Sequence, residues 1–137
     1  MDRNDLRALS RVRLSEARAL LKAGLPDGAY YLAGYAVECA LKACIAKETQ
    51  RYEFPEKKRV NASHTHDLGE LVKVAELQDE LQAAAKADTL FRKYWNDVRE
   101  WSELSRYVEH SQESARDLIE AVGDRRHGVI KWFKHYW

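Results

Sequence analysis

The sequence predicts an all-α protein, and three observations support this prediction. The 137 residues include only two prolines and six glycines, so long stretches contain no helix breaker. Apolar residues recur at three- and four-residue steps, without the strict alternation of a half-buried strand. Hydrophobic residues make up 45% of the chain, enough for one core without disulfides or metal. We therefore expect a single domain over residues 1–137, an up-and-down bundle of four to five helices.

The first two helices are the most clearly marked. The first is predicted from about Asp5 to Lys22, with Asn4 as its candidate cap. The second is predicted to begin near Asp27, a good N-cap residue, and to continue to about Thr49. Because this second helix is apolar on nearly every side, we expect it at the centre of the bundle.

A loop and a short helix are expected next. Residues 50–66 combine Phe54-Pro55 with the basic run Lys57-Lys58-Arg59 and lack helical periodicity, which is typical of a loop. His66-Asp67-Leu68 then begins a third helix that ends near Leu77, with Asp67 capping its first amides.

The fourth helix is predicted to be the longest, from about Leu81 to Val108. Apolar residues at three- and four-residue steps form its core stripe: Leu90, Tyr94, Val98, Trp101, Leu104 and Val108. Ser111 is expected to cap a last helix, which Gly123 and Gly128 bend.

Composition and charge exclude several classes of protein. The 23 lysines and arginines almost balance 22 acidic residues, so no global field attracts nucleic acid or an anionic membrane, and any such contact must come from local patches. The amino terminus lacks a signal-peptide pattern and no segment is long and apolar enough to span a membrane. Cys39 and Cys44 lie five residues apart on a predicted helix and are interpreted as buried thiols. We therefore expect a cytoplasmic protein.

Four polar side chains interrupt the apolar second helix. Tyr31, Tyr35, Glu38 and Lys42 are spaced four, three and four residues apart, which places them on one line along the helix; we call this line the seam. Glu38 precedes Lys42 in the favourable order for an ion pair, and Gly34 beside the seam allows close approach of a backbone or a ligand. Two interpretations stay open: a core ion pair with two packed tyrosines, or a ligand-binding groove.

A second polar stripe is predicted on the fourth helix. Trp95, Arg99, Ser102 and Arg106 repeat the same spacing, so two guanidinium groups are expected to point the same way. Arginines beside aromatic rings suit phosphate contact and base stacking. The alternative is that Arg99 pairs with Glu103 or another acid.

Two further motifs carry weaker signals. His64-Thr65-His66-Asp67 offers metal-binding side chains, but no matched spacing occurs elsewhere, so we expect no metal and no other cofactor. Arg125-Arg126-His127 is interpreted as a solvated face, with a phosphate-binding patch as the alternative.

With these motifs, the chain resembles the HEPN domains, a family named for nucleotide binding in higher eukaryotes and prokaryotes. The motifs are the segment 28–43, His66-Asp67-Leu68, Ser105-Arg106-Tyr107, and Ser114-Ala115-Arg116 in the last helix. The resemblance implies an up-and-down helical bundle that forms homodimers. It also implies a frequent genetic partner, a minimal nucleotidyltransferase, and a role in toxin–antitoxin or related defence systems.

Many HEPN proteins are metal-independent ribonucleases with an arginine, four to six residues, and a histidine near the end of a late helix. At that place this chain has Arg106 and His110 with only three residues between them. On a helix, the shortening turns the histidine by about 100°. The family spacing occurs literally from Arg59 to His64 or His66, within the predicted loop.

Three functions follow as hypotheses. The first is binding of a nucleotide or RNA, through ten candidate ligand-binding residues: Tyr31, Tyr35, Glu38, Lys42, His66, Asp67, Arg99, Ser102, Arg106 and Tyr107. The second is a ribonuclease toxin in which Arg106 stabilises phosphorane charge and His110 transfers a proton. The third is a structural dimer without a ligand.

Overall fold

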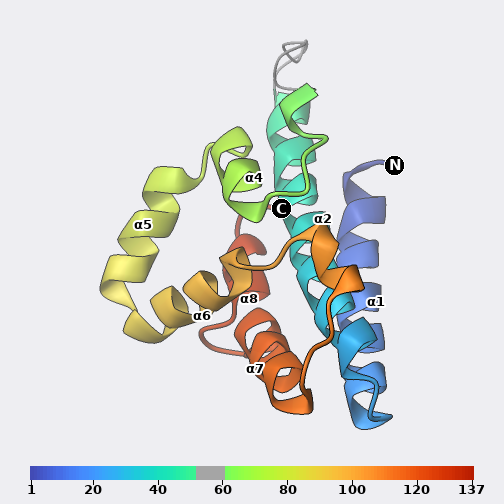
Figure 1. Cartoon of the computed structure of the whole chain (residues 1–137). Helices are drawn as coiled ribbons and strands as arrows, with labels where there is room; N and C mark the ends of the chain where they lie inside the picture. The colour runs from blue at the N-terminus through green and yellow to red at the C-terminus, as the bar shows by residue number, and fades with distance from the viewer. Residues whose placement is uncertain (52–60) are drawn as a thin grey trace.

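The computed structural model describes residues 1–51 and 61–137, and for residues 50 and 51 only the backbone. Within these ranges the protein is all-α, with no strand (Figure 1). The predicted loop motifs Phe54-Pro55 and Lys57-Lys58-Arg59 lie outside the described residues. The elements are α1 (Arg3–Lys22), α2 (Pro26–Arg51), α4 (Leu68–Val74), α5 (Gln78–Ala87), α6 (Thr89–Arg99), the 3-10 helix η1 (Glu103–Tyr107), α7 (Gln112–Gly123) and α8 (Val129–Phe133).

The helices α1 and α2 are long, as predicted, but their first residues differ from the prediction. Asp2, not Asn4, caps α1, and it forms a reciprocal capping box with Asp5. The helix α2 begins at Pro26, whose missing N–H costs nothing in a first turn. Asp27 therefore lies inside the helix, and its carboxylate accepts a hydrogen bond from the backbone N–H of His110 at 2.6 Å.

The short third helix is confirmed as α4, although it ends at Val74, before the predicted end near Leu77. The Asp67 carboxylate accepts a hydrogen bond from the backbone N–H of Glu70 at 3.0 Å and caps the helix, as predicted. After α4 the chain reverses through Glu76, which has a φ of 59°.

The prediction of a single long fourth helix is wrong, because two polar side chains interrupt the helical run. The Asp88 carboxylate caps α6 by accepting hydrogen bonds from the backbone N–H groups of Leu90 and Phe91. Ser102 caps η1 in a reciprocal capping box with Ser105. Such short side chains compete for backbone amides and favour a new start over a continuing helix. The predicted core stripe is therefore divided: Tyr94, Val98 and Trp101 are buried, whereas Leu90, Leu104 and Val108 are exposed.

The predicted bend in the last helix is a complete break. Ser111 caps α7 as expected, through the backbone N–H of Ser114. The chain then turns at Asp124, whose carboxylate accepts backbone hydrogen bonds from Arg126 and His127. A side chain at Gly128 would lie 2.4 Å from the Asp124 carbonyl oxygen, so only glycine fits before α8. Instead of four to five helices, seven α-helices occur in the described part of the chain.

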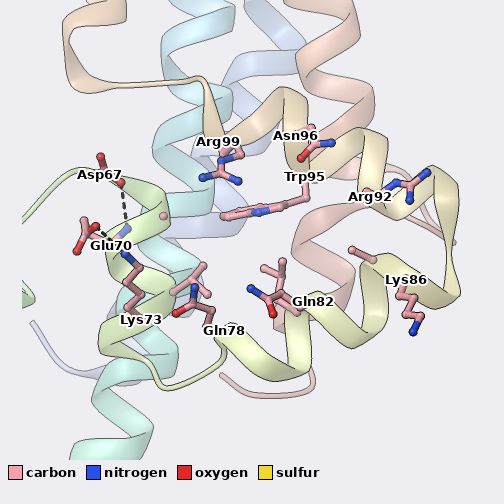
Figure 2. Close-up of a pocket in the computed structure, with 14 residues that line it drawn as sticks. Asp67, Glu70, Lys73, Gln78, Gln82, Lys86, Arg92, Trp95, Asn96 and Arg99 are labelled. Carbon is pink, nitrogen blue, oxygen red and sulfur yellow. Dashed lines mark hydrogen bonds and ion pairs between the residues drawn. The ribbon is translucent and has the colours of Figure 1, made fainter.

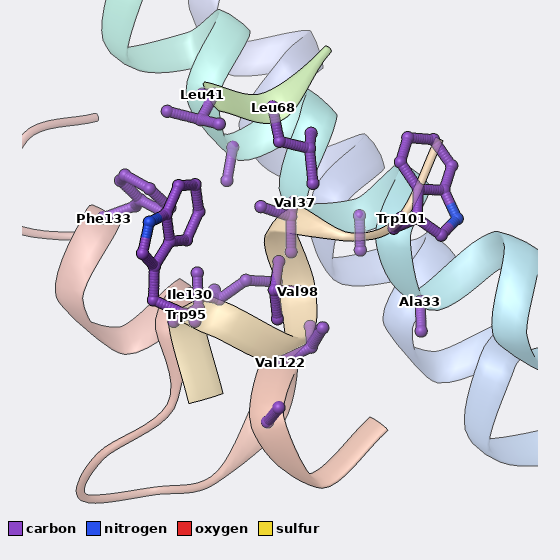
Figure 3. Packing of buried hydrophobic residues seen from close by; sticks show 14 of the residues in the cluster. Ala33, Val37, Leu41, Leu68, Trp95, Val98, Trp101, Val122, Ile130 and Phe133 are labelled. Atoms are coloured by element: carbon purple, nitrogen blue, oxygen red, sulfur yellow. The ribbon is translucent and has the colours of Figure 1, made fainter. Parts of the chain in front are cut away.

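The expected central position of α2 is confirmed. It packs against α1 along its length and also contacts α4, η1, α7 and α8. In Figure 1, α5 and α6 project to the side away from α1. Figure 3 shows the core around α2, where side chains from α2, α4 and the later helices meet. Its largest fully buried side chains are Trp101, Phe133, Leu41, Leu68, Leu71, Val37, Val98, Val122 and Val129.

Both cysteines are buried and free, as predicted. Burial raises the pKa of Cys39 to about 11 and that of Cys44 to about 12, so both thiols stay protonated at neutral pH. No described helix is both long enough and apolar enough to cross a membrane.

Candidate functional site

The buried carboxylate of Glu38 organises one half of the seam. Only 2% of Glu38 is exposed. Its Oε1 accepts a hydrogen bond from Nδ1 of His66 at 2.8 Å, and its Oε2 lies 3.4 Å from Nζ of Lys42. On the far side of the imidazole, Nε2 of His66 lies 3.3 Å from Oε2 of Glu103. We call Glu38, Lys42, His66 and Glu103 the Glu38 cluster.

The Glu38 cluster links three parts of the chain through polar contacts. Glu38 and Lys42 belong to α2, His66 precedes α4, and Glu103 begins η1. A neutral imidazole has one N–H, so His66 donates to both carboxylates only when it is protonated. Burial of a carboxylate is costly without partners, and the lysine and the histidine offset that cost.

An aromatic group forms the other half of the seam. The indole of Trp101 packs directly on Gly34, where an added Cβ would lie 2.2 Å from the ring. The ring centroid of Tyr31 lies 5.8 Å from that of Trp101 and 6.1 Å from that of Tyr35. The close approach expected at Gly34 is thus made by a side chain of the same protein. Only 2% of Trp101 is exposed, and its Nε1 has no hydrogen-bond partner in the described structure.

Arg106 lies where η1 passes the amino-terminal part of the seam. Its guanidinium stands 4.9 Å from the ring centroid of Tyr107. Tyr107 is the main cause that raises the pKa of Arg106, and the nearby hydroxyl group of Tyr31 adds to the effect. Arg106 is exposed, and Tyr107 is 73% exposed. A permanent cation and an aromatic ring therefore face solvent together.

The structure adds three residues that the sequence did not assign to the site. Glu103 was considered only as a partner of Arg99, and Trp101 only as a core residue. The guanidinium of Arg13, on α1, lies 6.0 Å from the ring centroid of Tyr35. The periodicity of the sequence could not predict these contacts, because they depend on how η1 and α1 pack against α2 in the folded protein.

The predicted stripe of Trp95, Arg99, Ser102 and Arg106 does not lie on one helix. The helix α6 ends at Arg99, and Ser102 caps η1. Trp95 and Arg99 line a separate groove that also includes Asp67 (Figure 2), whereas Arg106 contacts Tyr31 and Tyr107. The break at residues 100–102 therefore corrects the prediction that the two guanidinium groups share a face.

His110 is held by three contacts. Its ring stacks on Tyr30 with centroids 3.7 Å apart and planes 9° apart. Nε2 lies 3.1 Å from the Ser105 carbonyl oxygen, which can only accept, so Nε2 donates. The backbone N–H donates to Asp27. The helical rotation of about 100° does not apply, because η1 ends at Tyr107 and the chain is then extended.

The remaining sequence motifs have other partners or lie elsewhere. Arg59, the start of the literal family spacing, is outside the described residues. His64 lines a cavity between α1 and α2, and Nδ1 of His127 donates a hydrogen bond to the Asp88 carboxylate at 2.6 Å. Arg125 and Arg126 are exposed, as a solvated face requires. No group of three or more potential metal-binding side chains occurs within residues 1–51 and 61–137.

Comparison with known families agrees with this architecture. The HEPN domain family matches residues 5–135. The chain belongs to the HEPN family. Neither a curated protein nor a solved structure matches it. Within this HEPN domain, the segment 28–43 that carried the resemblance is the buried centre of α2, and Ser105-Arg106-Tyr107 ends η1.

We predict that Gly34→Ala displaces Trp101 and lowers the free energy of unfolding by about 1–3 kcal/mol, the usual cost of overpacking. Urea unfolding followed by tryptophan fluorescence measures the change. Gly28→Ala on the same helix is the matched control, because its Cβ meets only the flexible end of Leu20, at 3.0 Å. The control should stay within about 1 kcal/mol of the parent protein. Equal changes in the free energy of unfolding for both substitutions would contradict the packing of the Trp101 indole on Gly34.

Proposed function

We propose that this HEPN domain binds a nucleotide or a segment of RNA at the surface where η1 crosses α2. The observation that supports it best is the exposed pair Arg106 and Tyr107, which stands beside the seam through the contact between Arg106 and Tyr31. Lys42, at the other end of the seam, supplies a second partly exposed cation. Because the overall charge of the chain is balanced, any contact with nucleic acid must come from a local patch of this kind.

The side chains at this surface match the two parts of a nucleotide. A guanidinium donates two parallel hydrogen bonds to a phosphate, and an exposed tyrosine ring offers a face for base stacking. The Glu38 cluster fixes the surroundings of both, because Glu103 and Arg106 lie on the same short helix. The buried carboxylate then has a positional role: it fixes His66 and η1 relative to α2.

The contacts of His110 favour binding over cleavage. A ribonuclease would use Arg106 to stabilise phosphorane charge and His110 to move a proton. The Ser105 carbonyl already engages Nε2 of His110, and Tyr30 covers one face of the ring. Only Nδ1 of the neutral ring is left as an acceptor. We therefore propose binding as the primary function and treat cleavage as the competing one.

We predict that Arg106→Ala and Lys42→Ala each weaken binding of a short single-stranded RNA by about tenfold, because each removes a charged hydrogen-bond donor. Fluorescence anisotropy at one fixed salt concentration measures the dissociation constants, with unlabelled nucleotides as competitors. Arg116→Ala is the matched control, since Arg116 is an exposed arginine on α7.

Two results of this experiment would count against the proposal. If neither substitution changes the affinity for RNA, the binding surface does not lie at η1. Cleavage of the labelled RNA that His110→Ala abolishes would make the protein a ribonuclease, and gel electrophoresis of the same samples detects it.

We also propose that the domain forms a homodimer and works with a minimal nucleotidyltransferase in a toxin–antitoxin system. Family membership supports the partnership, and a neighbouring nucleotidyltransferase gene would test it. The dimer is supported by two apolar side chains of η1 and its C-cap, since Leu104 is 62% and Val108 is 54% exposed. Large apolar side chains grouped at the surface often mark a contact with another protein.

For the dimer, we predict a two-chain species in sedimentation velocity at micromolar concentration. Leu104→Glu should shift it toward the monomer, because a charge in an apolar contact is costly to desolvate. Val12→Glu, at an exposed apolar position on α1, is the control. A monomeric parent protein at this concentration would contradict the dimer.

A further inference from the structure

A groove separate from the Glu38 cluster lies between α4, α5 and α6. Its volume is about 490 Å³, within the usual range for a ligand pocket. Figure 2 shows Trp95 in its middle, with Arg99 on one side and Gln78 and Gln82 on the other. Trp95 is buried and packs edge-on against Phe133, so the groove has a fixed apolar floor. We call it the α5–α6 groove.

Polar side chains line both walls of the α5–α6 groove. The wall on α5 carries polar residues at four-residue steps, so they share one face: Gln78, Gln82 and Lys86. The wall on α6 carries residues four and three apart, which also share one face: Arg92, Asn96 and Arg99. All six are exposed.

The charges lie at the two ends of the groove and the amides lie between them. Lys86 and Arg92 flank the turn that joins α5 to α6, and Arg99 lies at the end beside α4. Arg99 follows Arg92 by seven positions, which corresponds to about 10 Å along the helix. Gln82 and Asn96 occupy the space between these ends.

Most of the positive charge in the groove is not neutralised by the described residues. Glu70 pairs with Lys73 at 3.2 Å, and the Asp67 carboxylate is engaged in capping α4. Within residues 1–51 and 61–137, no carboxylate forms an ion pair with Lys86, Arg92 or Arg99. Three such cations in one groove favour an anionic ligand.

We propose that the α5–α6 groove holds a short segment of single-stranded RNA, with phosphates at its two cationic ends and base edges against its central amides. This inference rests on the proposed function, because it extends the same ligand beyond η1. Asp67 lines the groove and follows His66 of the Glu38 cluster, so the groove adjoins that cluster, and Glu103 of the cluster lies on η1 with Arg106.

The spacing of the charges favours a strand over a single phosphate. The backbone positions of Arg92 and Arg99 lie about 10 Å apart along α6, and Figure 2 shows the two side chains at opposite ends of the groove, with Trp95 between them. Two phosphates of one strand can engage both guanidinium groups at these ends, whereas a single phosphate would have to draw both side chains toward the middle. The amides between them carry donors and acceptors, as base edges require, and arginine suits the phosphates.

The test compares oligonucleotides of two, four and eight nucleotides with AMP, by anisotropy across a range of salt concentrations. The double variant Arg92→Ala/Arg99→Ala should weaken octamer binding at least tenfold. It should also reduce the slope of log K against log salt by about 1.4, that is about 0.7 for each phosphate that the variant no longer neutralises. Lys93→Ala is the matched control, because Lys93 is an exposed cation of α6 that pairs with Asp97, outside the groove. Thermal melting followed by circular dichroism verifies that each variant folds.

The outcomes separate this inference from the proposed function. If the double variant behaves like Lys93→Ala while Arg106→Ala still weakens binding, the groove is overturned and the η1 surface stands. If the double variant weakens binding while Arg106→Ala does not, the groove is supported and the η1 surface is overturned. If AMP binds as tightly as the octamer, or the salt slope is unchanged, no strand occupies the groove.

Discussion

The contact between the Trp101 indole and Gly34 determines where the candidate site lies. Trp101 follows the end of α6 at Arg99, and its indole leaves no room for a side chain at position 34. From there Ser102 starts η1, which carries Glu103 toward His66 and Arg106 toward Tyr31. Without this packing, the polar seam of α2 would have no second wall, and its residues would form only a local ion pair with two tyrosines.

In the same region, burial of the Glu38 carboxylate has a desolvation cost that lowers the stability of the fold unless partners offset it. Glu38 is removed from water, and loss of its partners would leave a buried charge uncompensated. Those partners come from two elements, Lys42 within α2 and His66 ahead of α4, so the cluster joins distant parts of the chain. The HEPN fold therefore places a charged, partly exposed set of side chains against its most apolar helix. That arrangement fits a binding surface, which must be rigid and still reachable.

Sequence reasoning succeeded where signals are local and failed where they compete. Asp67 and Ser111 were identified as caps, and the position of α2 followed from its apolar composition. The long fourth helix failed because the apolar stripe through Val98 and Trp101 obscured the caps at Asp88 and Ser102. The seam was predicted as a line along α2, but its contact with Glu103 depends on a tertiary crossing. The α5–α6 groove could not be predicted either, because its two walls form only where the break at Asp88 divides the chain into α5 and α6.

The most direct measurement of the binding account follows the four tryptophan indole N–H signals by NMR while a short single-stranded RNA is added. Trp101 lies under η1 and Trp95 forms the floor of the α5–α6 groove. Trp132 and Trp137 lie elsewhere, beside Tyr136 and beside Arg7 and Arg11 respectively. The account predicts that the Trp101 and Trp95 signals shift and saturate together, while the other two stay fixed. Shifts confined to Trp132 or Trp137 would contradict it.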